Sequence, residues 1–212
     1  MFTKLLRFSL PLVAMSLSAA NFPNPVVDAP QQAGPTQTAV LSGGCFWGVD
    51  AVFKHVKGVL QVTSGYSGGA KSTAAYEIVS TGTTGHAESV EIKFDPSQVT
   101  YGQLLKVFFA VAHDPTELNY QGPDHGTQYR SSIFYANDEQ KRIAEAYIQQ
   151  LSQAKVYHSK IVTQVVPLKA FYAAEDYHQN YLESHTDQPY IVYNDLPKLR
   201  ALKSQLPELC KK

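Results

Sequence analysis

A sharp junction between a buried strand and a helix constrains the fold of this chain more than any other feature. The apolar run 39–41 predicts a short strand over residues 37–42. Two glycines at positions 43 and 44 break that run, and apolar residues then recur at helical spacing at positions 49, 52, 53 and 56. The chain must therefore turn from a strand into a helix at these glycines, and Cys45 lies at the turn.

The remaining patterns alternate between strands and helices. They predict further strands over residues 59–66, 89–95, 129–136 and 161–166, and a loop over residues 67–75. Three more helices are predicted: Thr100 and Gln103 form a capping box before one, Asn137 caps another, and Pro207 ends the last. Such alternation predicts an α/β or α+β arrangement of layers.

The length and the charge balance limit the class of protein. A chain of 212 residues favours one domain, which we place at residues 36–212 after an extended linker over residues 21–35. The 18 Lys and Arg residues balance the 18 Asp and Glu residues, so the chain offers no basic face and we expect no nucleic acid as a partner. Neither a nucleotide-binding fingerprint nor a metal-ligand spacing occurs, and we predict no metal.

The first 20 residues have the pattern of a cleavable signal peptide. Lys4 and Arg7 precede an uncharged and mostly apolar stretch over residues 8–20, which ends in the small residues expected before a cleavage after Ala20. The stretch is too short for a spanning helix, which needs ~20 residues. A buried N-terminal helix is the alternative. We expect a periplasmic or secreted protein with no stable membrane association after cleavage.

Cys45 is the strongest candidate for a reactive group. It lies on the first turn of the predicted helix, where unpaired backbone N–H groups favour an anion and lower the pKa of a thiol. Phe46 and Trp47 place two large aromatic side chains beside the sulfur, suited to an apolar substrate group. The alternative is a buried, inert cysteine among core aromatics.

Glu88 is a candidate general acid. It has the same parity as Val90, Ile92 and Phe94 along the predicted strand, so it points toward the apolar face if the strand includes it. A carboxyl in apolar surroundings has a raised pKa and can stay protonated near neutrality. The alternative is a glutamate at the strand end that turns into solvent.

Four sequence blocks in the same order resemble type A peptide methionine sulfoxide reductases. They are residues 43–48 (GGCFWG), 84–88 (TGHAE), 124–130 (DHGTQYR) and 174–182 (AEDYHQNYL). The resemblance extends from about Thr38 to Tyr190. It implies a ferredoxin-like, two-layer α+β core with a mixed sheet, followed by an extended C-terminal tail.

The resemblance implies a role for each residue of a substrate pocket. Cys45 is the nucleophile that attacks the sulfur of methionine S-sulfoxide, free or in proteins, and it ends as a sulfenic acid. The other roles are a cage for the substrate methyl group (Phe46, Trp47), the acid that protonates the oxygen (Glu88), hydrogen bonds to that oxygen (Tyr76, Tyr129) and the polar side of the pocket (Asp124).

The resemblance also implies how the sulfenic acid is resolved. Cys210, the only other cysteine, attacks it to form a disulfide, which a thioredoxin-like donor reduces without a prosthetic cofactor. The chain departs from the family in two places: its tail lacks the usual glycines, and residues 73–75 (TAA) precede Tyr76 where the family has Asn-Pro-Thr. We expect a monomer.

Two other functions fit the bare residues. One is a cysteine hydrolase, in which His125 or His178 serves as the base for Cys45. The other is a secreted binding domain closed by a structural disulfide between Cys45 and Cys210. A histidine within hydrogen-bond distance of Cys45 would favour the hydrolase, whereas a cluster of Glu88 and tyrosines would favour the reductase.

Overall fold

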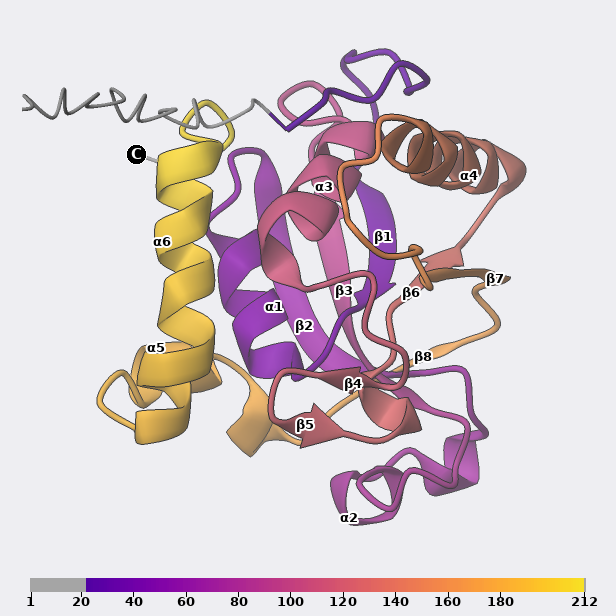
Figure 1. Cartoon of the computed structure of the whole chain (residues 1–212). Helices are drawn as coiled ribbons and strands as arrows, with labels where there is room; N and C mark the ends of the chain where they lie inside the picture. The colour runs from indigo at the N-terminus through magenta and orange to yellow at the C-terminus, as the bar shows by residue number, and fades with distance from the viewer. Residues whose placement is uncertain (1–21, 212) are drawn as a thin grey trace, which may run out of the picture.

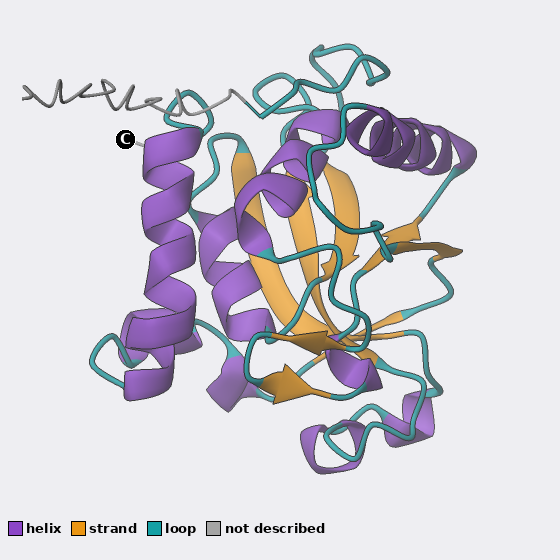
Figure 2. Cartoon of the chain, in the orientation of Figure 1, coloured by secondary structure: helices purple, strands orange, loops and turns teal. Residues whose placement is uncertain are grey.

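The computed structural model describes residues 22–211 and shows a mixed six-stranded sheet covered by helices (Figure 1, Figure 2). The strands of the sheet are Gln37–Ser42 (β1), Val59–Ser67 (β2), Ala87–Phe94 (β3), Ser132–Tyr135 (β6), Gln164–Pro167 (β7) and Phe171–Ala173 (β8). The α-helices are Phe46–Lys54 (α1), Tyr76–Val79 (α2), Tyr101–Val107 (α3), Asp138–Gln153 (α4), Tyr181–Ser184 (α5) and Leu196–Gln205 (α6).

The strand order is β7-β6-β1-β3-β2-β8. Within it, the sequence β1-α1-β2-β3-α3-β6 forms the antiparallel order β6-β1-β3-β2 of a ferredoxin-like core. β7 adds a parallel strand beside β6, and β8 pairs with the free side of β2. The predicted α+β fold with a mixed sheet is confirmed.

The sequence signals for the core elements are confirmed. Val90, Ile92 and Phe94 of β3 are fully buried, as their alternation predicts. The capping box of Thr100 and Gln103 begins α3, and the Asn137 side chain accepts a hydrogen bond from the backbone of the first turn of α4. Each signal satisfies backbone groups that a helix end leaves unpaired.

Two strand boundaries were wrong. The strand predicted over residues 129–136 begins only at Ser132, because Thr127–Tyr129 form a 3₁₀ turn that follows Gly126 at a positive φ of 134°. The strand predicted over residues 161–166 occupies Gln164–Pro167. Short elements with no clear sequence signal include a two-stranded hairpin, Tyr120–Gln121 (β4) and Asp124–His125 (β5).

The N-terminal segment runs along the domain surface as an extended chain from Phe22, without helix or strand before β1. Its Asp28 carboxylate accepts hydrogen bonds at the start of α3, from the Thr100 hydroxyl and from the Gly102 backbone N–H at 2.8 Å. The Tyr147 hydroxyl donates to the Pro23 carbonyl at 2.7 Å. The segment therefore contributes to the stability of the domain.

Residues 1–20, the predicted signal peptide, lie outside the described residues. Within residues 22–211, no helix is both long and apolar enough to cross a membrane.

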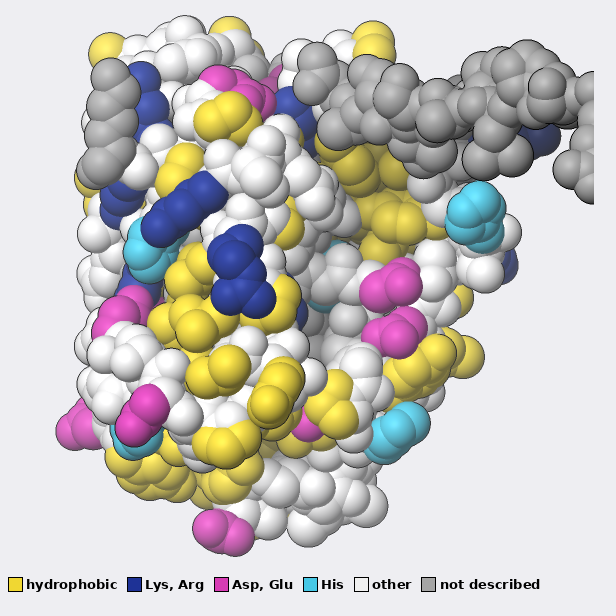
Figure 3. All heavy atoms as spheres, turned by 60° about the vertical axis from the view of Figure 1, so that its left-hand side comes forward, with side chains coloured by type: hydrophobic (Ala, Val, Ile, Leu, Met, Phe, Trp, Pro, Cys, Tyr) yellow, Lys and Arg dark blue, Asp and Glu magenta, His cyan; other side chains and the backbone are white. Residues whose placement is uncertain are grey.

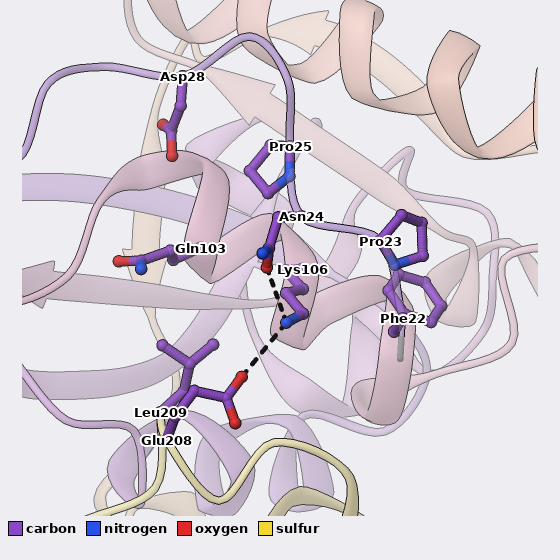
Figure 4. A pocket seen from close by; sticks show the side chains of 9 residues that line it. All are labelled: Phe22, Pro23, Asn24, Pro25, Asp28, Gln103, Lys106, Glu208 and Leu209. Atoms are coloured by element: carbon purple, nitrogen blue, oxygen red, sulfur yellow. Dashed lines mark hydrogen bonds and ion pairs between the residues drawn. The ribbon is translucent and has the colours of Figure 1, made fainter. Parts of the chain in front are cut away.

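The C-terminal tail is docked against the far end of α1. Cys210 pairs with Val56 in an isolated antiparallel bridge, and the Lys57 backbone N–H donates to the Leu209 carbonyl at 2.8 Å. The buried Lys106 ammonium of α3 donates to Glu208 at 3.3 Å and to Asn24 at 2.9 Å (Figure 4). This lysine thereby joins the tail to the N-terminal segment across a cavity of about 560 Å³.

We predict that Asp28→Ala lowers the free energy of unfolding by about 1–2 kcal/mol, because the substitution removes the acceptor at the start of α3. Urea denaturation measures the change. Gln32→Ala, in the same exposed segment, is the control and should change stability by less than about 0.5 kcal/mol. An equal effect of the two substitutions would show that Asp28 has no special role.

Candidate active site

The junction between β1 and α1 leaves no room for side chains beside Cys45. Gly44 has a positive φ of 87°, and a Cβ there would meet the Gln121 side chain at 2.7 Å. A Cβ on Gly43 would meet the His113 ring at 2.8 Å. The two glycines thus allow the chain to turn within a packed layer, and they place Cys45 at the N-cap position of α1.

Glu88 lies on the apolar face of β3, as the parity of the strand predicts. The residue is 2 % exposed, and its Oε2 atom accepts a hydrogen bond of 3.0 Å from the Phe46 backbone N–H. Burial raises the pKa of the Glu88 carboxyl to about 8, and the Phe46 hydrogen bond opposes this rise only in part. The carboxyl is therefore protonated at neutral pH and sits against the first turn of α1.

The Cys45 thiol differs from the sequence expectation. Its pKa is raised well above the usual value, first by burial and then by the charges of Glu88 and Asp195. The Trp47 backbone N–H and the Lys198 ammonium lower the pKa, but they do not offset burial. The predicted net lowering of the Cys45 pKa was wrong, because burial outweighs the lowering by the N–H groups at the helix N-terminus.

The fourth sequence block fixes the orientation of Trp47. The Tyr181 ring stacks on the indole with a centroid distance of 3.7 Å and an interplanar angle of 7°. The indole N–H donates to the Nδ1 atom of His178 at 3.1 Å. On another edge, Tyr190 packs at 85° with a centroid distance of 6.0 Å. The indole is therefore a fixed wall.

The loop before Tyr76 is held by groups from two distant segments. The Glu175 carboxylate accepts from the Tyr76 backbone N–H at 2.9 Å and from the Tyr66 hydroxyl at 2.8 Å. His86 accepts from the Gly69 backbone N–H at 3.2 Å through Nδ1, so its Nε2–H donates to the Ala70 carbonyl at 3.0 Å. These contacts place Tyr76 at the cavity even though residues 73–75 depart from the family pattern.

Arg130 connects the third sequence block to the second. Its guanidinium donates to the carbonyls of His86 at 3.0 Å and Gly85 at 2.9 Å, just before Glu88 in the chain. Because Tyr129 directly precedes Arg130, these hydrogen bonds fix the position of Tyr129 relative to Glu88. Asp124, on the adjoining hairpin, accepts a 2.5 Å hydrogen bond from the Tyr190 hydroxyl.

These segments enclose one cavity of about 200 Å³ beside the Cys45 sulfur. All seven residues that the sequence assigned to the substrate pocket line it, together with one that it did not assign: Cys45, Phe46, Trp47, Tyr76, Glu88, Asp124, Tyr129 and Tyr190. Tyr190 was missed because it precedes an irregular π-helical turn, where no periodic pattern marks an inward-facing side chain. The cavity combines an aromatic wall with a thiol, a protonated carboxyl and three phenols.

Comparisons with known proteins agree with this geometry. The family model "Peptide methionine sulfoxide reductase" matches residues 37–209. The chain belongs to this family. It is 61% identical over 180 residues to a peptide methionine sulfoxide reductase of Mesorhizobium japonicum, covering 84% of this chain and 92% of that protein. A relative from Synechocystis sp. is 50% identical over 192 residues, covering 89% and 90%.

Solved structures show the same fold. Methionine sulfoxide reductase A of Corynebacterium diphtheriae is 36% identical, with a TM-score of 0.62, and the match covers 77% of this chain and 82% of that one. As a member of the peptide methionine sulfoxide reductase family, the protein is an oxidoreductase that reduces methionine sulfoxide by thiol chemistry.

The structure does not support the two other functions considered from the sequence, a cysteine hydrolase and a binding domain closed by a Cys45–Cys210 disulfide. Within residues 22–211, no hydrogen bond joins Cys45 to a histidine: His178 accepts from the Trp47 indole, and His125 stacks on Tyr120 with a centroid distance of 5.4 Å. Both cysteines are free thiols. Cys210 lies outside the cavity, at the opposite end of α1 from Cys45. Separately, residues 22–211 contain no group of three or more side chains that could ligate a metal.

The raised pKa of Glu88 predicts a pH dependence of stability. Because the folded state holds the proton more tightly than the unfolded state, Glu88 stabilises the fold below about pH 4.5 and loses this contribution as pH rises through about 8. Glu88→Gln keeps an acceptor for Phe46 and cannot ionise. Its free energy of unfolding, measured in urea, should therefore rise relative to the wild type between these pH values, by up to about 1.4 kcal/mol per pH unit. Parallel pH profiles for the two proteins would contradict a protonated Glu88.

Proposed function

We propose that the protein reduces the S epimer of methionine sulfoxide, free or in proteins, with Cys45 as the nucleophile and Glu88 as the acid. The observation that carries this proposal is the cavity in which a thiol and a protonated carboxyl meet beside an aromatic wall. Phe46 and the fixed Trp47 indole accommodate the methyl group of the substrate. Apolar walls with a few polar groups are what a methyl sulfoxide requires.

The chemistry follows from the groups in the cavity. A sulfoxide oxygen is a poor leaving group until it is protonated, so Glu88 donates its proton to the oxygen while the Cys45 thiolate attacks the sulfur. A bond forms between the Cys45 sulfur and the substrate sulfur while the S–O bond breaks, and the protonated oxygen leaves as water. Water then adds to the Cys45 sulfur as the S–S bond breaks, which releases methionine and leaves a sulfenic acid on Cys45. Methionine is reduced by two electrons, and the Cys45 sulfur is oxidised by two.

Tyr76, Tyr129 and Asp124 complete the polar side of the pocket. Burial and the nearby Glu88 carboxyl raise the pKa of both tyrosines, so their hydroxyls remain proton donors at neutral pH. Both can hydrogen-bond the sulfoxide oxygen. Asp124 is already bound by the Tyr190 hydroxyl, and this pair forms the polar rim next to Cys45.

Resolution by Cys210 requires the docked tail to move. Helix α1 has nine residues and rises 1.5 Å per residue, so its length of about 14 Å separates Cys45 at one end from the Val56–Cys210 bridge beyond the other. A disulfide needs Cα atoms about 6 Å apart. We propose that the tail leaves its bridge with Val56 and folds back toward the cavity. The extended chain from Leu206 to Cys210 reaches at most about 14 Å from the end of α6.

The remaining proposals concern the environment of the reaction. A thioredoxin-like dithiol protein reduces the Cys45–Cys210 disulfide by thiol–disulfide exchange, and no prosthetic cofactor takes part. The protein acts as a monomer on oxidised proteins and free methionine sulfoxide, in the periplasm or outside the cell. The basic, apolar and small-residue pattern of residues 1–20 supports export.

The direct test of this function is an assay on the separate epimers of a methionine sulfoxide peptide with dithiothreitol. We predict turnover of the S epimer and none of the R epimer, followed by chromatography of the peptide. Cys45→Ser should abolish turnover, because a hydroxyl is not ionised at neutral pH as a thiol can be. Reduction of the R epimer alone, or activity of Cys45→Ser, would contradict the proposal.

Glu88→Gln tests the role of the acid. The variant should lose on the order of 10²–10⁴-fold in the rate of the first turnover, because it cannot donate a proton to the oxygen. In the wild type, that rate should fall as pH rises through about 8, where Glu88 ionises. Rapid-quench measurement of methionine formation gives both results. A loss below about threefold would assign proton transfer to water or a tyrosine.

Cys210→Ser tests the resolving step. The variant should keep near-normal activity with dithiothreitol, because a small reductant reaches the sulfenic acid in the open cavity. With a thioredoxin it should lose turnover and accumulate a sulfenic acid on Cys45 that a dimedone-type probe traps. Full turnover with thioredoxin would make Cys210 dispensable.

A further inference from the structure

A buried ion pair lies beside the first turn of α1, on residues that the proposed mechanism does not use. Asp195 is fully buried at the start of α6, and its Oδ1 atom accepts a hydrogen bond of 3.1 Å from the Lys198 ammonium. Its Oδ2 atom is buried without a hydrogen-bond partner within the described residues. Unpartnered carboxylate oxygens are costly in a protein interior, so the pair calls for a functional explanation.

Gly48 brings this pair close to Cys45. A Cβ at Gly48 would lie 2.1 Å from the Asp195 Oδ1 atom and 2.8 Å from the Lys198 Nζ atom. Gly48 is three residues after Cys45 on the same helical turn, so side chains at these two positions share one face. The Lys198 ammonium therefore lies within about 9 Å of the Cys45 Cβ atom. Any other residue at position 48 would push the pair away.

A second, smaller cavity borders both Cys45 and Lys198, the cation of the pair. It measures about 90 Å³, and both Cys45 and Lys198 line it, together with Asn194 and Asp124. Figure 3 views the side of the molecule that α6 covers and shows several Lys and Arg side chains along it. The Lys198 side chain is only 22% exposed because it turns inward to Asp195, whereas Lys203 on the same helix is exposed.

We propose that Lys198, held in place by Asp195, is a positioning residue that stabilises the Cys45 thiolate electrostatically from outside the substrate cavity. This inference rests on the proposed role of Cys45 as the nucleophile. Among the described residues, the ammonium is the one cation that acts on the Cys45 thiol, where Glu88 on β3 and Asp195 before α6 supply negative charge. Asp124 and three phenols line the same cavity: Tyr76, Tyr129 and Tyr190. His113 and His178 pack behind Gly43 and Phe46, and burial lowers the pKa of both imidazoles.

The test measures the titration of Cys45 without substrate, so its outcome is independent of sulfoxide reduction. In a Cys210→Ser background, the rate of alkylation by iodoacetamide is followed against pH. We expect Lys198→Met to raise the midpoint by about one pH unit, the size of one charge interaction at this distance. Lys198→Arg should restore the midpoint of the parent, and Lys203→Met, the matched control on α6, should leave it unchanged.

A second variant separates electrostatics from folding. Lys198→Met leaves the Asp195 charge uncompensated, so the double variant with Asp195→Asn should return the midpoint toward that of the parent. The first-turnover rate of Lys198→Met at pH 7, where Glu88 still holds its proton, should fall about tenfold and return toward that of the parent in the double variant. An unchanged midpoint in Lys198→Met, an equal shift in Lys203→Met, or a rate loss that the added Asp195→Asn substitution does not reverse would overturn the proposal.

Discussion

The hydrogen bond from the Phe46 backbone N–H to Glu88 is the contact on which the site depends. It joins the first turn of α1 to β3, a central strand of the sheet, so Cys45 and Glu88 keep their relative positions as long as the sheet and the helix pack. It also places a carboxyl where a helix end would attract an anion, while burial keeps that carboxyl protonated. The balance between these two effects fixes the charge of the pocket.

Other parts of the fold position the remaining walls of the pocket relative to the Phe46–Glu88 hydrogen bond. Segments far apart in the sequence converge on it: Arg130 ties the third block to the residues before Glu88, and Tyr181 with His178 fixes the Trp47 ring. The tail behaves differently. Its ion pair with Lys106 involves the exposed Glu208 carboxylate, and such pairs contribute little to stability. Leu206 and Leu209 are buried, however, and the Leu209 carbonyl accepts a hydrogen bond from the Lys57 backbone N–H. The proposed movement of Cys210 therefore has to break these contacts, while the pocket keeps its geometry.

The sequence predicted the fold and most of the site because both depend on local signals. Alternation placed Glu88 inward, and two glycines before Cys45 marked the turn into α1. The features that the sequence did not predict have a common cause, because each depends on contacts between residues that are distant in the chain. The pKa of Cys45 depends on burial and on Glu88 and Asp195, which are distant in the chain, and no periodic pattern marks Tyr190. The position of Cys210 across α1 likewise depends on a bridge that its own residues do not specify.

The protonation state of Glu88 tests the account most directly, because acid catalysis and the low charge of the pocket both require it. Infrared difference spectra of the wild type against Glu88→Gln, recorded across pH, isolate the carbonyl band of this carboxyl. The account predicts that the band of the protonated acid persists at neutral pH and disappears with a midpoint of about 8. A carboxylate already formed at about pH 6, near the ordinary range for a glutamate, would contradict it.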